Sequence, residues 1–279
     1  MNVKYAPSEY TMQNLVEHHE AGLRLGLFVG VFAIMAMLEV VSPRKARTQT
    51  RAKRWATNLG IVVIYSVLMR FVFPVAAMGA ASFAISKEWG LLNMFPLPVS
   101  ANIILTFLVL DFAIYWQHVV SHKIPVLWRI HKMHHADRDI DVSTGARFHP
   151  LEIILSMLYK MLVIVLLGSA VIGVFVFEIL LTASSMFNHA NVKLPLWLDR
   201  AVRVFVVTPD MHRVHHSTVG TETDRNYGFF LSLWDKIFQT YQEQPKAGHN
   251  DMVIGLPQYQ SEKPAHLLWS LMLPFRKSP

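Results

Sequence analysis

The sequence predicts an all-α integral membrane protein: a helical bundle of about three spanning helices plus a helical hairpin, with a cytoplasmic histidine-rich helical cap. Three observations support this prediction. Of the 279 residues, 53% are hydrophobic and only 16% are charged, and the mean hydropathy is +0.33. Several apolar stretches approach or exceed the ~20 residues that a spanning helix needs. Most of the 14 histidines fall in tight clusters beside these stretches.

Composition limits the classes of function. The chain has no cysteine, which excludes disulfides and thiolate metal sites. The net charge of +7 comes from basic residues beside apolar segments and not from a separate basic domain, so no nucleic-acid partner is expected. No repeat, low-complexity tract or flexible linker indicates a second domain. We expect one domain over residues 1–279, with a catalytic core at about 99–245.

The first half of the chain predicts two crossings. A helix at about residues 23–41 should span, and the densest basic run of the sequence follows at residues 43–54. The positive-inside rule places that run in the cytoplasm. A second apolar stretch, about residues 58–85, returns to the opposite face with a kink expected at Pro74. Arg70 would be costly at membrane depth, so we expect it to face the bundle interior or a polar cavity.

The second half predicts one more crossing and a hairpin. A third helix runs from about residue 98 to His122, so its histidines emerge at the cytoplasmic end. The apolar block at residues 153–187 is too long for one ordinary span and carries Gly168 and Gly173 near its middle. We interpret it as two short helical arms that enter and return on the same face. The metal site depends on this hairpin, because a single crossing would separate the histidines before the block from those after it.

The histidine spacing carries the functional signal. His118 and His122 are four residues apart at the end of the third helix, so they project from one face. Two matching HxxHH triplets follow, HKMHH and HRVHH. Within each triplet the histidines fall at i, i+3 and i+4, which is a single helical face. The triplets comprise His131, His134 and His135, and His212, His215 and His216.

Eight histidines are more than one ion can hold, so two metal ions are the simplest interpretation. Neutral imidazole suits iron, zinc, copper and nickel, so the ligand type does not choose the metal. His189, at the exit of the hairpin, is a ninth candidate. His149 is a tenth, either as a ligand or as a group that supports one. His249 and His266 have no companions and are expected to be ordinary histidines.

Asp111 is the remaining polar candidate on the third helix. It precedes His118 by seven residues, almost two turns, and so shares its face but lies deeper in the bilayer. An intramembrane carboxylate is costly and commonly functional. Two roles remain open: a supporting role at the metal site or its cavity, and helix packing.

At these residues the sequence resembles the fatty acid hydroxylase and sterol desaturase superfamily. The resemblance spans roughly residues 111–241. It implies an all-helical membrane fold with a cytoplasmic cap, a non-haem di-iron centre and O2-dependent attack on an unactivated C–H bond. Many members carry Arg after the first box histidine, where this chain has Val119; the difference leaves the ligands intact. The matching motifs are the HxxxH of His118 and His122, HKMHH, Arg147-Phe148-His149-Pro150-Leu151-Glu152, Phe187-Asn188-His189-Ala190-Asn191, Thr208-Pro209-Asp210-Met211 before HRVHH, Asn226-Tyr227-Gly228 and Leu233-Trp234-Asp235.

The resemblance implies a lipid hydroxylase or desaturase with two iron ions, O2 as co-substrate and a membrane lipid as substrate. Asp111 and Asn226 are candidates to support the ligands. The sequence has no Rossmann fingerprint, haem-attachment motif or cysteine cluster, so electrons should come from a separate reductase, ferredoxin or cytochrome. We expect a multi-pass protein of a bacterial inner membrane with its histidine boxes on the cytoplasmic face. The expected metal ligands are His118, His122, His131, His134, His135, His149, His189, His212, His215 and His216.

Two other functions are compatible with a histidine-rich membrane protein. A membrane zinc hydrolase would use an open coordination position to activate water, but it usually needs a nearby carboxylate base, and the chain has no HExxH motif. A bis-histidine haem electron carrier or a metal transporter would place its histidines on facing transmembrane helices or along a pore. Metal content and a haem absorption band distinguish these alternatives from the di-iron oxygenase.

Overall fold

The computed structural model describes residues 7–73 and 76–276, and over these residues it contains helices, loops and isolated bridges but no β-strand. Five segments are long and apolar enough to cross a membrane. They are His19–Val41, Arg51–Met94, Val99–Lys123, Pro150–Leu167 and Val171–His189. The all-helical integral membrane fold is thus confirmed.

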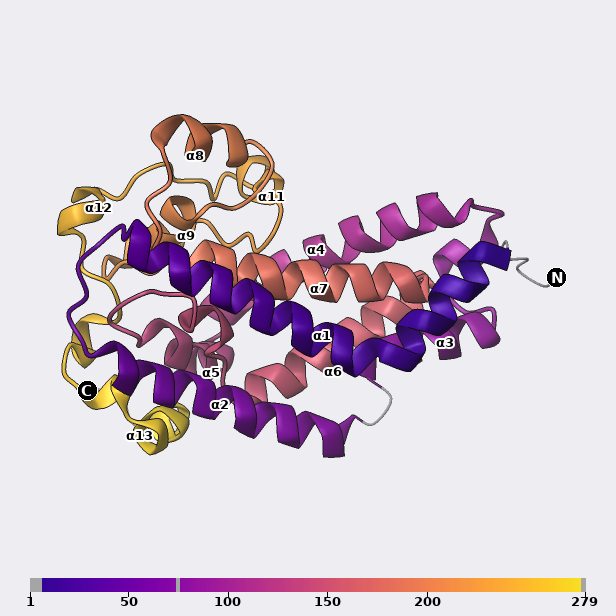
Figure 1. Ribbon diagram of the computed structural model, residues 1–279, viewed down its shortest axis with the longest axis horizontal. Helices are drawn as coiled ribbons and strands as arrows, with labels where there is room; N and C mark the ends of the chain where they lie inside the picture. Colours follow the sequence, from indigo (N-terminus) through magenta and orange to yellow (C-terminus); the bar gives the residue numbers. More distant parts are fainter. Residues whose placement is uncertain (1–6, 74–75, 277–279) are drawn as a thin grey trace.

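The long helices lie side by side, and the short helices gather at one end of the bundle (Figure 1). We call this end the cap. Opposite it, α3 packs against α6 and α7, while α7 also packs against α1 and α4. The long helices are α1 (Pro7–Val41), α2 (Arg51–Val72), α4 (Val99–Lys123), α6 (Pro150–Leu167) and α7 (Val171–His189), with the shorter α3 (Ala76–Ser86) and η1 (Leu91–Met94) at the far end. The cap contains α5 (Pro125–His135), η2 (Thr144–Ala146), α8 (Leu196–Val202), α9 (Pro209–His215), α10 (Gly220–Thr223), α11 (Leu233–Ile237), α12 (Gly248–Asp251), η3 (Pro257–Tyr259), η4 (Lys263–Ala265), α13 (Leu267–Met272) and η5 (Leu273–Phe275).

The apolar block at residues 153–187 forms the predicted pair of arms, α6 and α7. Gly168 ends α6 in the left-handed region at φ +75°, where a Cβ would come within 2.8 Å of Asn93 Nδ2 and 2.9 Å of the Trp89 carbonyl oxygen. Glycine therefore allows the chain to reverse closely against the loop after α3. The arms are longer than the short arms expected: they have 18 and 19 residues, and by length and composition each is a candidate membrane span.

Two expectations about the second apolar stretch have different outcomes. The kink expected at Pro74 lies outside the described residues; α2 ends at Val72 and α3 begins at Ala76. Arg70 was expected to face inward, and this is wrong, because its side chain is exposed in the last turn of α2. At a helix end the long side chain can reach the interface, and its charge is favourable beside the helix carboxyl terminus.

Small side chains allow the helices around α3 to pack closely. The alanines of α3 on its inner face are buried, among them Ala77 and Ala81 at 0% exposure. They contact a core that includes Leu110 of α4, Ile164 of α6 and Phe177 of α7. Close approach of backbones through small residues is the usual way in which membrane helices associate. This core joins α3 to α4, α6 and α7 in the part of the bundle away from the cap.

A buried ionic network connects α2 to the loop that follows α5. Arg54 donates to both carboxylate oxygens of Asp137 at 2.7 Å, and it also pairs with Asp141. Burial alone would raise the pKa of Asp137, but the adjacent Arg54 outweighs burial and holds it well below its usual value. Arg147 donates to the Met133 carbonyl at 3.1 Å and to Asn58 at 2.6 Å. These contacts fix the position of α5, which carries the first HxxHH box.

Candidate metal centre

Histidines from four helices and the residue after α9 meet inside the cap in two groups. Within each group the nitrogen atoms that could bind a metal lie within 4.8 Å of one another. Their side chains are buried, with exposures between 0 and 3%. The first group, which we call the five-histidine group, is His118, His122, His131, His135 and His215; the second, the four-histidine group, is His134, His189, His212 and His216. The structure thus brings together nine of the ten sequence candidates.

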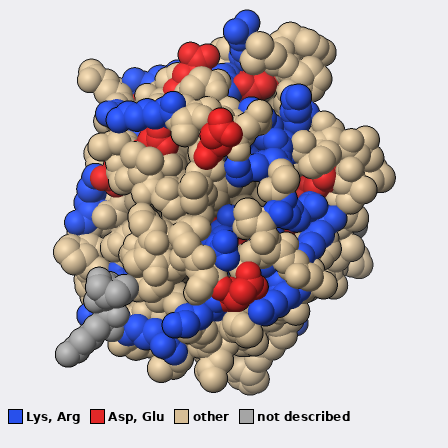
Figure 2. All heavy atoms as spheres, turned by 90° about the vertical axis from the view of Figure 1, so that its left-hand side faces the viewer, with Lys and Arg blue, Asp and Glu red and all other residues tan. Residues whose placement is uncertain are grey.

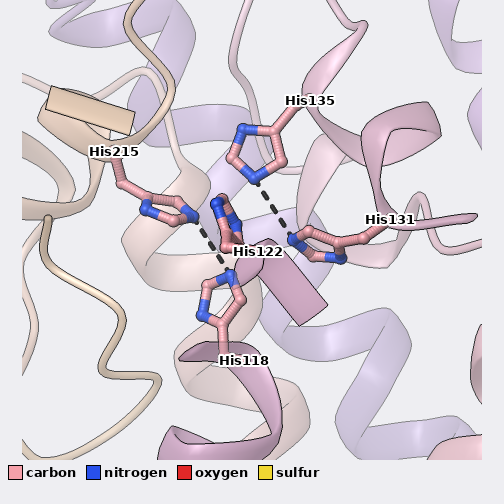
Figure 3. A group of neighbouring side chains, drawn as sticks. All are labelled: His118, His122, His131, His135 and His215. Carbon is pink, nitrogen blue, oxygen red and sulfur yellow. Dashed lines mark hydrogen bonds between the residues drawn. The ribbon is translucent and has the colours of Figure 1, made fainter. Parts of the chain in front are cut away.

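The rings of the five-histidine group converge on a common space (Figure 3). His215 Nε2 lies 3.0 Å from His118 Nε2, and His135 Nε2 lies 3.2 Å from His131 Nε2. His122 projects toward the same space, and its buried Nε2 has no hydrogen-bond partner among the described residues. A buried ring nitrogen without a partner is costly. A cation at this point would satisfy it.

His189 lies at the centre of the four-histidine group, in contact with its three other members. Its Nε2 lies 3.0 Å from His134 Nε2, 3.1 Å from His212 Nε2 and 3.2 Å from His216 Nε2. One nitrogen cannot hydrogen-bond three others at once in this way, since a neutral imidazole has a single N–H. Two nitrogens bound ~2.1 Å from one ion at a right angle would be separated by ~3.0 Å. The observed spacings therefore fit nitrogens arranged around one metal ion.

The two HxxHH boxes divide their ligands in the same manner. In the first box, His131 and His135 join the five-histidine group while His134 joins the other. In the second box, His212 and His216 share the four-histidine group. His215 crosses to the five-histidine group. In both boxes the i and i+4 side chains thus serve one group, and the i+3 side chain serves the other.

Carbonyl groups orient two rings of the five-histidine group. His118 Nδ1 donates to the Tyr227 carbonyl and His215 Nδ1 donates to the Arg225 carbonyl, each at 2.7 Å. A neutral ring that carries its proton on Nδ1 presents a bare lone pair at Nε2. The facing Nε2 atoms of His118 and His215 would therefore repel each other at 3.0 Å, and a cation between them removes that repulsion.

Asn226 lies between these two carbonyls and holds them in place. It adopts φ +52°, a conformation that asparagine tolerates better than most residues. Its side-chain amide donates to the Met211 carbonyl at 2.7 Å and to the Gln242 carbonyl at 2.8 Å. Among the described residues, Asn226 has no hydrogen bond to a histidine ring. It acts instead on the loop whose carbonyls orient His118 and His215.

Glu152 supports the five-histidine group, although the histidine spacing does not point to it. His131 Nδ1 donates to Glu152 Oε1 at 2.6 Å. A carboxylate behind a ligand histidine fixes the tautomer and makes the ring a stronger donor to a metal. The available signal was its position in the first turn of the helix that follows His149 and Pro150, three residues after a candidate ligand.

Burial keeps the cap histidines in the neutral form that binds metals. Burial first, and then the neighbouring imidazoles, lower the pKa of His134 and His135 well below the usual value. His212 and His216 have pKa values lowered by the same causes. The pKa of His215 falls to about 3, mainly through burial. At neutral pH these rings are uncharged, and metal binding requires no proton release from them.

His149 lies outside both groups, so we remove it from the ligand set. It is the N-cap of α6, where its Nδ1 accepts a hydrogen bond from the Leu151 N–H at 3.1 Å. Its Nε2 is 3.1 Å from the Leu271 carbonyl oxygen. Both ring nitrogens are therefore occupied. His249 and His266 also lie outside the groups.

Asp111 makes the contacts of a packing residue. Its Oδ2 accepts hydrogen bonds from Trp234 Nε1 at 2.8 Å and from the Leu231 N–H at 3.3 Å. These bonds tie α4 to the segment around α11. Among the described residues Asp111 has no hydrogen bond to a ligand histidine, which favours the packing role over direct support of the metal site.

A pocket of about 250 Å3 lies between α4, α5 and α6, beside the five-histidine group. Glu152 belongs to its wall and also contacts His131. This pocket could not be predicted from the sequence, because its walls come from three helices whose mutual orientation depends on the cap. The lining residues are Trp116, Gln117, Val120, Ser121, Leu127, Ile130, Glu152, Leu155, Ser156 and Tyr159.

Comparison with known proteins agrees with this site. The family model for fatty acid hydroxylases matches residues 103–240, which include both HxxHH boxes. The ornithine lipid hydroxylase OlsE of Rhizobium tropici is 26% identical over 242 residues, covering 82% of this chain and 70% of the relative. No solved structure matches the chain at a significant level.

Two further relatives oxidise other lipids, as their names state. Human alkylglycerol monooxygenase is 30% identical over 157 residues, or 54% of this chain, and the match spans only 32% of that protein. Methylsterol monooxygenase 2-2 of Arabidopsis thaliana is 27% identical over 164 residues, which cover 57% of this chain and 61% of the relative. The matching region and the relatives agree with the histidine motifs, and the chain belongs to the fatty acid hydroxylase and sterol desaturase superfamily.

Proposed function

We propose that this chain is a membrane-embedded di-iron oxygenase that uses O2 to hydroxylate or desaturate a membrane lipid. The observation that carries the proposal is the pair of histidine groups, nine buried imidazoles with nitrogens spaced as around two ions. The relatives are named as lipid and sterol monooxygenases and hydroxylases, which supports lipid oxidation. Hydroxylation and desaturation begin with the same hydrogen abstraction, so the histidines do not separate them.

The protein residues have three tasks in this proposal. The five-histidine group would hold one ion and the four-histidine group the other. When bound, a pair of irons supplies the O2 redox chemistry that an unactivated C–H bond requires. Glu152 and the carbonyls of Arg225 and Tyr227 keep the ligand rings oriented. Burial of the groups keeps bulk water away from the reacting atoms.

The proposal also covers the source of electrons and the side of the membrane on which the cap lies. A separate reductase, ferredoxin or cytochrome would deliver electrons at the cap, on the cytoplasmic side of a bacterial inner membrane. Lys and Arg are spread over this end of the molecule and outnumber the Asp and Glu visible there (Figure 2). A basic membrane-proximal surface is typical of the cytoplasmic side.

The other functions fit less well. A catalytic zinc keeps three protein ligands and one open position for water, whereas four or five imidazole nitrogens surround each space here. Two axial haem ligands need a wide slot between them for the macrocycle, but here four or five nitrogens crowd within 4.8 Å. The groups also lie together in the cap and not along a path through the bundle, as transport would require.

The decisive experiment is metal analysis of full-length protein purified from iron-supplemented cells without chelator. We expect about two irons per chain with the Mössbauer signature of a coupled di-ferric pair, and O2-dependent oxidation of a lipid once a reductant is added. One zinc per chain, or a haem absorption band, would contradict the proposal.

A further inference from the structure

The pocket beside the five-histidine group opens on the outer surface of the bundle. Three of its lining residues are more than a third exposed: Trp116 at 37%, Val120 at 36% and Leu155 at 45%. They lie on α4 and α6, two of the helices that are able to cross a membrane. An apolar rim on such helices faces lipid chains. A ligand would therefore enter the pocket sideways from the bilayer.

Three polar side chains, Gln117, Glu152 and Ser156, interrupt the mainly apolar wall of this pocket. The Ser156 hydroxyl donates to Gln117 Oε1 at 3.1 Å, a bond that joins α6 to α4. Gln117 Nε2 donates no hydrogen bond to any residue in the described ranges. Glu152 uses Oε1 for His131, while its Oε2 is buried and has no partner within the described part of the chain. Gln117 Nε2 is thus an unused donor at this wall, and Glu152 Oε2 is an unused acceptor that is buried within it.

Size limits what the pocket can hold. Sites for drug-sized ligands commonly measure ~300–1,000 Å3, and this pocket measures about 250 Å3. It has room for a segment of one lipid, with the remainder of the molecule left in the bilayer. The segment that enters comes next to Glu152 and therefore close to the five-histidine group.

We propose that this pocket binds the lipid segment next to the reacting carbon, and that Gln117 and Glu152 select a polar group that both accepts and donates a hydrogen bond. A hydroxyl or a secondary amide has this character. An ester accepts but cannot donate, so it would leave Glu152 Oε2 unpaired in an apolar site. The identification of the bound segment as substrate rests on the proposed oxygenase function; the hydrogen-bond preference rests on the pocket alone.

The test uses two probes of the same chain length, one with and one without a donor beside the carbonyl: N-methyl hexadecanamide and methyl hexadecanoate. Both are tritiated, and their equilibrium binding to iron-loaded full-length protein in nanodiscs is measured. Leaving a buried acceptor unpaired weakens binding about tenfold. We expect the amide to bind about tenfold more tightly than the ester. Equal affinities, or no binding of either probe, would overturn the proposal.

Two variants separate the two contacts. Gln117→Leu removes the donor that serves the carbonyl of both probes, so it should weaken both and keep their ratio. Glu152→Gln can still accept from His131 through its amide oxygen, and it then presents an N–H to the pocket, so the preference for the amide should disappear. A ratio unchanged by Glu152→Gln would contradict the role of Glu152. Ser86→Ala, at the end of α3, is the matched control and should change neither affinity.

Metal content and O2-dependent lipid oxidation are measured on the same preparation. If the protein prefers the amide as expected but contains no iron and does not oxidise lipid, the proposed function is contradicted. The recognition by Gln117 and Glu152 is then unaffected. If the protein contains iron and oxidises lipid but does not prefer the amide probe, only the recognition by Gln117 and Glu152 is contradicted.

Discussion

His118 Nε2 on α4 faces His215 Nε2 on α9 at 3.0 Å, although the two residues are 97 positions apart in the chain. Because each ring donates its Nδ1 proton to a carbonyl oxygen, two lone pairs point at each other. A cation between them turns a repulsive contact into a link between the bundle and the cap. Metal binding should therefore be coupled to the stability of the cap.

The division into two groups makes a first prediction about metal stoichiometry. His215→Ala removes a ligand of the five-histidine group, and His216→Ala removes one of the four-histidine group. We expect each variant to lose at least one of the two irons per chain and to have no detectable lipid oxidation. The measurement is iron per chain by mass spectrometry on protein that still inserts into the membrane.

The control for these variants is His266→Ala. His266 is exposed and belongs to neither group, so this variant should keep its iron and its activity. Full iron loading in His215→Ala, or iron loss in His266→Ala, would show that the ligand set has been assigned incorrectly.

The histidine boxes show how far sequence spacing can predict the site. The i, i+3 and i+4 pattern identified six of the nine members, because it places the three rings on one side of a helix; His118 and His122 came from a separate i, i+4 pair, and His189 from its place at the exit of the hairpin. It did not predict that i and i+4 share a group while i+3 belongs to the other. That division depends on how α5 and α9 are turned toward each other, which the buried network around Arg54 and the loop around Asn226 determine.

The same limit explains why the expectations for His149 and Arg70 failed and why Glu152 was missed. Next to Pro150, His149 looked like another box histidine, but its ring caps a helix. The depth of Arg70 in the membrane was estimated from an apolar stretch whose helix ends at Val72. Glu152 was not singled out because only the packing of α5 against α6 brings it to His131.

His149 gives a second prediction. His149→Ala should keep both irons, since neither ring nitrogen of His149 takes part in the groups. It should lower stability by ~1 kcal/mol, which is typical for loss of an N-cap. Thermal unfolding together with iron content tests both parts. His149→Asn restores a capping side chain and should recover most of the stability; iron loss in both variants, although His149→Asn recovers the stability, would refute the assignment.

His249 gives a third prediction, on pH dependence. Burial lowers its pKa to about 4, against the pull of Asp210 at 3.6 Å. The folded protein then binds fewer protons than the unfolded chain between pH 4 and 6.5, so folding stability falls as the pH decreases through this window. Linkage gives a loss of ~2 kcal/mol at pH 5 from this residue.

His249→Gln removes that titration. Relative to the parent, the variant should gain ~2 kcal/mol when the pH is lowered from 7 to 5. The measurement is the difference between variant and parent in unfolding free energy at the two pH values, which cancels the contribution of the ligand histidines common to both. A difference that does not change with pH would mean that His249 is not buried as a neutral ring.

The length of α6 and α7 gives the last prediction, on topology. Each arm is long enough to cross the bilayer, and both ends of the pair lie at the cap, so Gly168 should reach the opposite face. Reporter fusions after Arg54, Pro150 and Tyr241 should report the cytoplasm, while a fusion after Gly168 should report the other side. A cytoplasmic signal at Gly168 would mean that the arms re-enter without crossing. A non-cytoplasmic signal at Tyr241 alone would separate the two HxxHH boxes across the membrane, and the contact between His118 and His215 could not then form.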